Sequence, residues 1–359
     1  MRIDNPALVV LGLVAAVVAA LAWAFTWDRW GRLARSAVIT VSVLSVAMTA
    51  LLQVNRMTEA YPSWAALVGR QPHHAAPAEP DVEPDLPQLP GGAPAAPARP
   101  GQSQMLAYQV GGRASGLTLP MYVYLPAGYG AAPGTRFPVI EASHGFPGTN
   151  ITWLRKLRVQ HYLDAEIAAG RMAPTVVLFP MQTTQALLDT ECTDLVHGPK
   201  ADTFLTTDVP AFAGAHFHVR TDRAGWGLIG YSAGGFCATN LLLRHPDRFA
   251  AAASLSGYAS PGIAIGDGSE NTYNNPAWRL QHLAQPAASL FLAWAEDDKV
   301  TRRDSLRLAA LAHAPIQVTT AVVAHGGHSH TVWEQMEPPA FDWLSAHLAR
   351  PDTKDARGT

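Results

Sequence analysis

Two long uncharged runs lie near the start of the chain. No charged residue occurs between Asp4 and Asp28, and a second, more polar run follows Arg35. About 20 consecutive apolar residues are enough to cross the hydrocarbon core of a membrane as a helix. The pattern predicts two transmembrane helices, at about 6–27 and 36–55. A cleaved signal peptide is the alternative for the first run, and a buried helix for the second.

The short connection between these runs, "DRWGRLAR", is basic. It carries Arg29, Arg32 and Arg35 against one aspartate. Short arginine-rich loops are retained in the cytoplasm. With this loop inside, both ends of a helical hairpin lie outside. Residues 1–57 are therefore predicted to be a membrane anchor, with the rest of the chain on the extracytoplasmic side.

Proline and alanine dominate the next segment, "QPHHAAPAEPDVEPDLPQLPGGAPAAPARPGQ", which almost lacks large apolar residues. Such a composition buries too little surface to fold and is typical of an extended, semi-rigid spacer. Residues 58–104 are therefore predicted to be a linker. The pair His73 and His74 is interpreted as part of this solvated linker rather than as a metal site.

Beyond the linker, short apolar runs alternate with helical patterns. The strand candidates are residues 121–129, 137–145, 173–181, 225–232, 250–257, 289–297 and 315–323, and the helix candidates are 153–170, 235–249 and 304–314. Buried strands that alternate with helices are typical of a mostly parallel sheet with helices on both faces. The pattern predicts an α/β domain at 105–350 and a disordered tail at 351–359.

Composition and charge narrow the possible partners. The chain has 359 residues, of which 48% are hydrophobic and 15% charged, so it is too apolar to be disordered throughout. Its formal net charge is −2, and no run rich in lysine or arginine occurs beyond the short connection at 28–35. A nucleic-acid partner is therefore not expected.

The segment "WGLIGYSAGGFCATNLLLRHP" contains the pattern G-x-S-x-G, formed by Gly230, Ser232 and Gly234. In a nucleophile elbow, a serine with this pattern lies on a strained turn between a strand and a helix. An apolar strand candidate precedes the pattern here and an amphipathic helix candidate follows it. Ser232 is therefore the predicted nucleophile, with a plain glycine-rich turn as the alternative.

A serine hydroxyl needs an adjacent base, which an acidic residue orients. In this architecture the chain order is serine, acid, histidine. Three acidic residues, Glu296, Asp297 and Asp298, follow a strand candidate. Asp298 is the preferred acid, Asp297 is the alternative, and Glu296 is disfavoured. A solvated acidic turn that caps the next helix is a further reading.

Three histidines, His325, His328 and His330, stand together in "AHGGHSHTVWEQ". A zinc site needs three or four ligands in a suitable spacing, and no matching set of ligands stands elsewhere in the sequence. A single general base on a glycine-flexible loop fits the cluster better. His328 is the predicted base, and no metal is expected.

Acyl transfer also needs N–H groups directed at the developing oxyanion. One donor is expected from the backbone of Ala233, next to the nucleophile. The second is expected from the loop after an early strand. That loop contains His144 and Phe146, and the backbone N–H of Phe146 is the predicted donor. His144 is expected to shape the loop rather than to take part in the chemistry.

The chain has two cysteines, Cys192 and Cys237. An even number of cysteines in an oxidising compartment permits a disulfide. A bond between them would hold the loop around Cys192 beside the predicted nucleophile. Two free buried cysteines are the alternative.

With these residues assembled, the chain resembles the esterase D and mycolyltransferase-like serine esterases of the α/β-hydrolase fold, from about Tyr108 to Leu348. The resemblance depends on "VYLPAGY", "HGFPGTNITW", "GYSAGGFCATNLLLRHPDRFAAAASLSGY" and "GGHSHTVWEQMEPPAFDWL", with Trp333 five residues past His328. It implies the same nucleophile and base and an acid near Asp298. The family often has Pro-Asp where this chain has Pro-Met at 180–181, so substrate contacts there are expected to differ.

The leading hypothesis is a membrane-anchored, extracytoplasmic serine esterase that acts on acyl esters or lipids through an acyl-enzyme, with no cofactor. An acyltransferase with the same triad is the first alternative. A non-catalytic envelope protein that keeps a hydrolase fold for binding is the second. Fold alone does not imply mycolate transfer, and the sequence does not specify the acyl chain or the alcohol.

Overall fold

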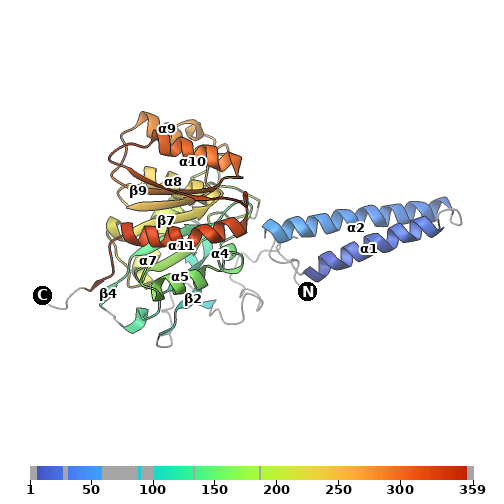
Figure 1. Cartoon of the computed structure of the whole chain (residues 1–359), viewed down its shortest axis with the longest axis horizontal. Helices are drawn as coiled ribbons and strands as arrows, with labels where there is room; N and C mark the ends of the chain where they lie inside the picture. Colours follow the sequence, from blue (N-terminus) through green and yellow to red (C-terminus); the bar gives the residue numbers. More distant parts are fainter. Residues whose placement is uncertain are drawn as a thin grey trace. The chain divides into compact units, whose positions relative to one another are not determined.

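The computed structural model describes residues 6–26, 31–58, 88–89, 101–131, 134–185 and 187–353. The chain divides into two compact units, residues 1–74 and 75–359 (Figure 1). Most of the predicted linker, together with the pair His73 and His74, lies outside the described residues.

The N-terminal unit is a hairpin of two helices, α1 (Pro6–Thr26) and α2 (Arg32–Thr58) (Figure 1). The helices approach closely at Gly12, where an added Cβ atom would lie 2.2 Å from Thr49 Oγ1. Most of the large apolar side chains described in both helices are exposed. By length and composition, both helices could cross a membrane. Both predicted apolar helices therefore form. Helix α2 begins at Arg32, earlier than the predicted start at about residue 36.

The second unit is built on a sheet with the strand order β1-β2-β3-β6-β5-β7-β8-β9-β10. In that order the strands are Gln88–Leu89, Gln104–Gly111, Thr118–Leu125, Val176–Pro180, Val139–Ser143, Trp226–Tyr231, Ala251–Leu255, Ser289–Ala295 and Gln317–Val323. The strands from β6 to β10 run parallel to one another, and β3 is antiparallel to both of its neighbours. Every predicted strand segment overlaps an observed strand. Strands β1 and β2 were not predicted, and β1 falls within the predicted linker.

Helices cover both faces of this sheet. One face packs on α4 (Ile151–Arg155), α5 (Val159–Ala168) and α11 (His330–His347). The other packs on the continuous segment α6 (Ala201–Thr203), η3 (Phe204–Asp208) and α7 (Val209–His216), and on α8 (Ala233–Arg244), α9 (Pro276–His282) and α10 (Lys299–Leu311). Single 3₁₀ turns occur at Tyr129–Ala131, Arg223–Gly225 and Ser269–Asn271.

Successive residues of one strand belong to different hydrophobic clusters, as Val139 and Ile140 of β5 do. This follows because side chains alternate between the two faces of a strand, and here both faces are covered. The predicted α/β architecture, a mostly parallel sheet between two helical layers, is confirmed.

Two details differ from the sequence prediction. The single helix expected at 153–170 is two helices, because Arg158 has φ 48° and interrupts the helical backbone before α5. The ordered chain also extends past residue 350. Asp352 and Thr353 form β11, which pairs antiparallel with β4 (Thr135–Arg136). Residues 354–359 of the predicted tail lie outside the described residues.

Candidate active site

The candidate residues lie on loops that follow parallel strands. Ser232 follows β7, the three acidic residues follow β9, the three histidines follow β10, and Phe146 follows β5. Because parallel strands end at the same edge of a sheet, these loops gather there. Residues far apart in sequence can therefore meet at this edge.

Ser232 lies at a tight turn between β7 and α8, with φ 56° and ψ −123°. A non-glycine residue with positive φ is strained and needs support from its surroundings. The glycines on either side allow this support. A Cβ atom on Gly230 would lie 2.1 Å from the carbonyl oxygen of Gly234, and one on Gly234 would lie 2.3 Å from that of Ser143. The G-x-S-x-G pattern thus allows α8 to pack directly on the ends of β7 and β5.

Ser232, His328 and Asp298 are connected by hydrogen bonds. His328 Nε2 lies 2.9 Å from Ser232 Oγ, and His328 Nδ1 lies 2.6 Å from Asp298 Oδ2. Because an ionised carboxylate only accepts, Nδ1 carries the proton and donates it. Nε2 is then free to accept the serine proton. This geometry is the one that a serine nucleophile with a histidine base requires.

Asp298 has a buried carboxylate with two different partners. Its Oδ2 accepts from His328, and its Oδ1 accepts the backbone N–H of Thr301 at 3.3 Å, which caps α10. Burial acts to raise the pKa of Asp298, but the hydrogen bonds from Thr301 and His328 outweigh it and leave the pKa below its usual value. Asp298 thus does two things that the sequence analysis treated as alternatives. It caps α10, and it accepts a hydrogen bond from His328.

The neighbouring acidic residues point elsewhere. Asp297 is largely exposed and accepts the backbone N–H of Gly326 at 3.2 Å. Glu296 forms an ion pair with Arg302 at 2.8 Å. Of the three acidic residues, the structure thus brings Asp298 to the imidazole of His328.

The three histidines occupy different surroundings. The side chain of His325 is 89% exposed, whereas that of His328 is 35% exposed. His330 is the first residue of α11, and its ring packs edge-to-face on Trp333. Burial lowers the pKa of His330, and the positive charge of Lys156 adds to this. Within the described part of the chain, no group of three or more His, Cys, Asp or Glu side chains is placed to hold a metal ion.

The loop after β5 lies against the nucleophile. A Cβ atom on Gly145 would lie 2.7 Å from the Tyr231 ring and 3.1 Å from Ser232 Cβ. Phe146 is the next residue of this loop. The N–H of Ala233 belongs to the first turn of α8, where backbone N–H groups have no partner within the helix. Both predicted oxyanion donors therefore belong to backbone beside Ser232.

His144 is buried under this loop. Its backbone N–H donates to Gln182 Oε1 at 3.1 Å, and Gln182 Nε2 donates back to the His144 carbonyl at 2.6 Å. Burial lowers the pKa of His144 to about 4, despite an opposing hydrogen bond with the Gly145 carbonyl. A neutral, buried imidazole agrees with a shaping role. Gln182, which the sequence analysis did not single out, clamps the loop from the end of β6.

Two residues near the nucleophile were also missed. Tyr258, on the loop after β8, has its hydroxyl 3.2 Å from Ser232 Oγ. Glu191 is buried close to Tyr258, and its charge contributes to raising the pKa of that tyrosine. Glu191 carries no local signal in the sequence, because its neighbours come from another loop. Tyr258 could have been noticed as the residue just beyond the end of an apolar strand.

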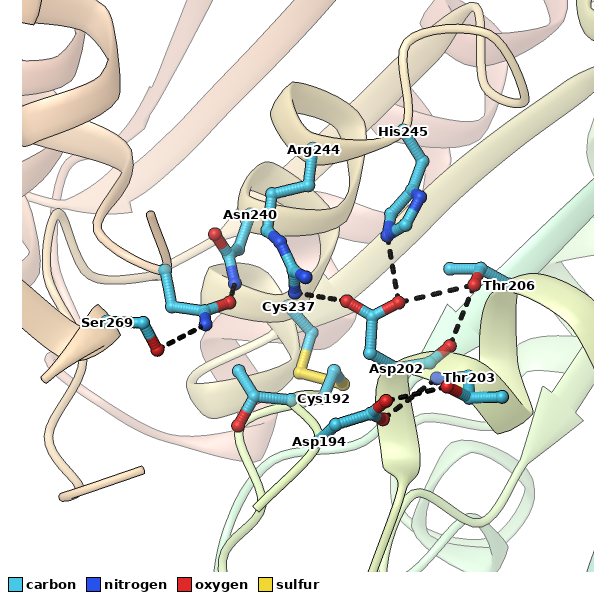
Figure 2. Close-up of polar contacts among 12 residues, drawn as sticks. Cys192, Asp194, Asp202, Thr203, Thr206, Cys237, Asn240, Arg244, His245 and Ser269 are labelled. Carbon is cyan, nitrogen blue, oxygen red and sulfur yellow. Dashed lines mark hydrogen bonds and ion pairs between the residues drawn. A yellow bond between two sulfur atoms is a disulfide. The ribbon is translucent and has the colours of Figure 1, made fainter. Parts of the chain in front are cut away.

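Cys192 and Cys237 form a disulfide across a sequence separation of 45 residues (Figure 2). The bond joins the Glu191 segment to α8, the helix that begins at the nucleophile. Near the other end of α8, Arg244 and His245 both pair with the buried carboxylate of Asp202, as Figure 2 shows. The helix is thus held to the segment of residues 192–202 at two places.

The strand order and the turn at Ser232 define an α/β-hydrolase fold, as predicted. The chain matches the model of the family described as "Putative esterase" over residues 114–358, and it belongs to that family. The predicted resemblance to serine esterases of this fold is confirmed.

The similar proteins are distant in sequence. An uncharacterised protein of Corynebacterium glutamicum is 25% identical over 241 residues, and the match covers 62% of this chain and 56% of that protein. The chain thus spans just over half the length of the curated relative it matches.

Solved structures share the fold. A ferulic acid esterase is 21% identical, with a TM-score of 0.61, over 69% of this chain and 99% of the other. An S-formylglutathione hydrolase from Agrobacterium tumefaciens is 15% identical, with a TM-score of 0.59, over 70% of this chain and 98% of the other. At these identities the likeness shows the fold.

Proposed function

We propose that the protein is a serine ester hydrolase or acyltransferase that forms an acyl-enzyme at Ser232. The observation that carries this proposal is the pair of hydrogen bonds at His328, 2.9 Å to Ser232 Oγ and 2.6 Å to Asp298 Oδ2. The family membership supports the same class of chemistry. The ferulic acid esterase and the S-formylglutathione hydrolase with this fold are also ester- or thioester-cleaving proteins by name.

The first half of the proposed reaction acylates the serine. His328 Nε2 accepts the Ser232 proton while Oγ attacks the ester carbonyl. The negative charge moves onto the carbonyl oxygen, where the N–H groups of Phe146 and Ala233 stabilise it. Asp298 stabilises the imidazolium. The bond to the alcohol then breaks, and His328 returns its proton to the departing alkoxide.

The second half releases the acyl group. Water, or an acceptor alcohol, gives its proton to His328 Nε2 as its oxygen attacks the acyl carbonyl. The bond to Ser232 Oγ breaks, and the proton returns to the serine. Whether the product is an acid or a new ester depends on which nucleophile reaches the acyl-enzyme.

We place this enzyme at a membrane, with its catalytic domain on the extracytoplasmic side. Residues 1–57 would be the anchor, 58–104 the linker and 105–350 the catalytic domain. Three features support this location. They are the two apolar helices, the arginine-rich connection between them, and a disulfide that an oxidising compartment would preserve.

Labelling with a fluorescent fluorophosphonate tests the chemistry. The full chain in detergent is expected to be labelled once, at Ser232, and the Ser232→Ala variant is expected to stay unlabelled. Mass spectrometry of the adduct locates the site. A folded wild-type protein that takes no label would contradict the acyl-enzyme and leave the non-catalytic binding protein as the better reading.

Protease treatment of intact cells tests the location. The catalytic domain is expected to be degraded from outside while a cytoplasmic marker survives, and the chain is expected to stay in the membrane fraction after carbonate extraction. A domain that is protected until the cells are lysed would place it in the cytoplasm.

A further inference from the structure

Tyr258 is the side chain from which the inference begins. Its hydroxyl lies 3.2 Å from Ser232 Oγ, and its ring stacks on His328 with a centroid separation of 6.3 Å. The serine has one proton, which it donates to His328, so the tyrosine must be the donor to Oγ. The tyrosine hydroxyl thus lies beside both the nucleophile and the imidazole that returns a proton to the departing alcohol.

Glu191 supplies a second oxygen-bearing group on the segment that lies against the loop of Tyr258. The residue is 3% exposed. Its Oε1 accepts the backbone N–H of Gly262 at 2.8 Å, on the loop that carries Tyr258. Its Oε2 is buried and has no hydrogen-bond partner in the described structure. A buried carboxyl oxygen without a partner is costly, and native structures rarely keep one without a use.

The backbone around Glu191 is strained and firmly held. Glu191 and Cys192 have φ values of 44° and 55°, in the left-handed region that favours glycine. The Glu191 N–H donates to Asp189 Oδ1 at 2.9 Å, and Cys192 is tied by its disulfide to α8. Strain that the surroundings enforce is found mostly at sites that bind or react.

Three carboxyl groups influence the hydroxyl of Tyr258. Burial raises the pKa of the Tyr258 hydroxyl, and Asp298, Glu191 and Asp189 raise it further, against an opposing hydrogen bond with Ser232. Burial also raises the pKa of Asp189, and it raises that of Glu191 to about 7. Such surroundings favour ligand groups that donate hydrogen bonds and disfavour anions.

We propose that Glu191 and Tyr258 form the subsite for the alcohol part of the ester, and that they select alcohols with a hydrogen-bond donor just beyond the ester oxygen. Tyr258 donates to the ester oxygen as it leaves, and Glu191 Oε2 accepts from the donor on the alcohol. This inference deepens the proposed acyl-enzyme reaction and depends on it. The balance of that reaction is unchanged: the carbonyl–alkoxide bond breaks, and His328 supplies the proton.

A series of esters with one acyl group tests the selection. The acyl chain is the one whose p-nitrophenyl ester releases p-nitrophenol fastest from the full chain. Its propyl, 2-hydroxyethyl and 2-(dimethylamino)ethyl esters differ only beyond the ester oxygen. We expect kcat/KM for one of the two donor-bearing esters to exceed that of the propyl ester by about 10- to 100-fold, because unpaired buried polar groups reject apolar analogues. Comparison of the 2-hydroxyethyl ester with the 2-(dimethylamino)ethyl ester shows whether the preferred donor is a hydroxyl or a protonated amine.

Two conservative variants locate the selection. Glu191→Gln is expected to reduce the ratio of donor-bearing to propyl ester by about tenfold. Tyr258→Phe is expected to lower kcat/KM for all three esters together, because its hydroxyl donates to the ester oxygen that they share. All the esters form the same acyl-enzyme, because they share one acyl group. The rate constant of deacylation is therefore common to them, and it is expected to change less than this ratio. Asp247→Asn, an exposed carboxylate that precedes β8 at the opposite end of the sheet, is the control expected to keep the ratio.

The outcomes separate the two levels of the proposal. Equal kcat/KM for the three esters in the wild type, or an unchanged ratio in Glu191→Gln, overturns the alcohol subsite while leaving the acyl-enzyme intact. Absence of p-nitrophenol release and of fluorophosphonate labelling overturns the acyl-enzyme itself. Because the test is a ratio, partial unfolding of a variant does not alter it.

Discussion

The nucleophile turn, residues 230–234, and the histidine loop, residues 324–329, meet at the active site but are built differently. Every residue of the turn is buried, and its glycines touch backbone atoms on other elements. The histidine loop is mostly exposed, and Gly326 and Gly327 have positive φ. Backbone packing therefore fixes the nucleophile, whereas contacts of one side chain, His328 with Asp298 and Trp333, fix the base.

The largest effect is expected at the turn. Ser232→Ala should reduce kcat for p-nitrophenyl esters by about 10⁴- to 10⁶-fold, because it removes the attacking atom. Thermal unfolding should stay close to that of the wild type, since alanine fits the same backbone less one oxygen. Retention of more than one-hundredth of the activity would mean that another residue attacks.

The histidine loop should show one sensitive position among three. His328→Ala should cost about as much as removal of the serine, because nucleophile and base act as a unit. His325→Ala and His330→Ala should keep kcat/KM within about tenfold, since neither imidazole contacts the serine. Comparable losses at all three, together with bound zinc by elemental analysis, would restore the metal reading of the cluster.

The acidic loop offers a matched pair. Asp298→Asn should reduce kcat by about 10⁴-fold, because the amide no longer fixes the imidazole tautomer. Asp297→Asn should stay within a fewfold of the wild type, since its carboxylate contacts the loop backbone instead. Steady-state kinetics of both variants at one pH compares them, and the reverse order would move the acid to Asp297.

The contrast in backbone packing is tested with two glycines. Gly234→Ala places a Cβ atom 2.3 Å from the Ser143 carbonyl oxygen. It should lower the free energy of unfolding by roughly 3 kcal/mol or more, since backbone must move. Gly327→Ala meets no atom within 4 Å but has φ +65°. It should cost only about 1–2 kcal/mol, the penalty of a left-handed residue. Denaturant titration measures both, and equal losses would contradict the comparison.

Glu191 gives the most pH-dependent effect. Its pKa, about 7 in the folded chain, is raised by burial above the unfolded value of about 4.3. Its neutral form thus stabilises the fold fully below pH 4.3, and this contribution is lost as the pH rises through 7. Glu191→Gln should remove that loss, which is worth about 2–3 kcal/mol between pH 5 and pH 8. Denaturant titrations at pH 5 and pH 8 should then differ less in the variant, whereas unchanged pH dependence would mean a carboxyl with an ordinary pKa.

Local features of the sequence predicted the parts of the molecule that depend on local structure. The apolar runs predicted the two N-terminal helices and most of the parallel strands, since burial on both faces of a sheet leaves a continuous apolar pattern. The G-x-S-x-G pattern predicted the turn at Ser232, because only small residues allow that approach of helix and strand. Interruption of a helix at Arg158 was not predictable, since arginine is ordinarily a good helix former.

The sequence by itself determined the order of serine, acid and histidine along the chain and the strand ends on which they stand. Only the tertiary structure decided which of the adjacent residues Asp297 and Asp298 faces the imidazole, because neighbours on a loop point in different directions. It also decided that Glu191 lies beside Tyr258. The two residues stand 67 positions apart in sequence, and their loops are joined by the hydrogen bond from the Gly262 N–H to Glu191 Oε1, while the disulfide holds the Glu191 segment to α8.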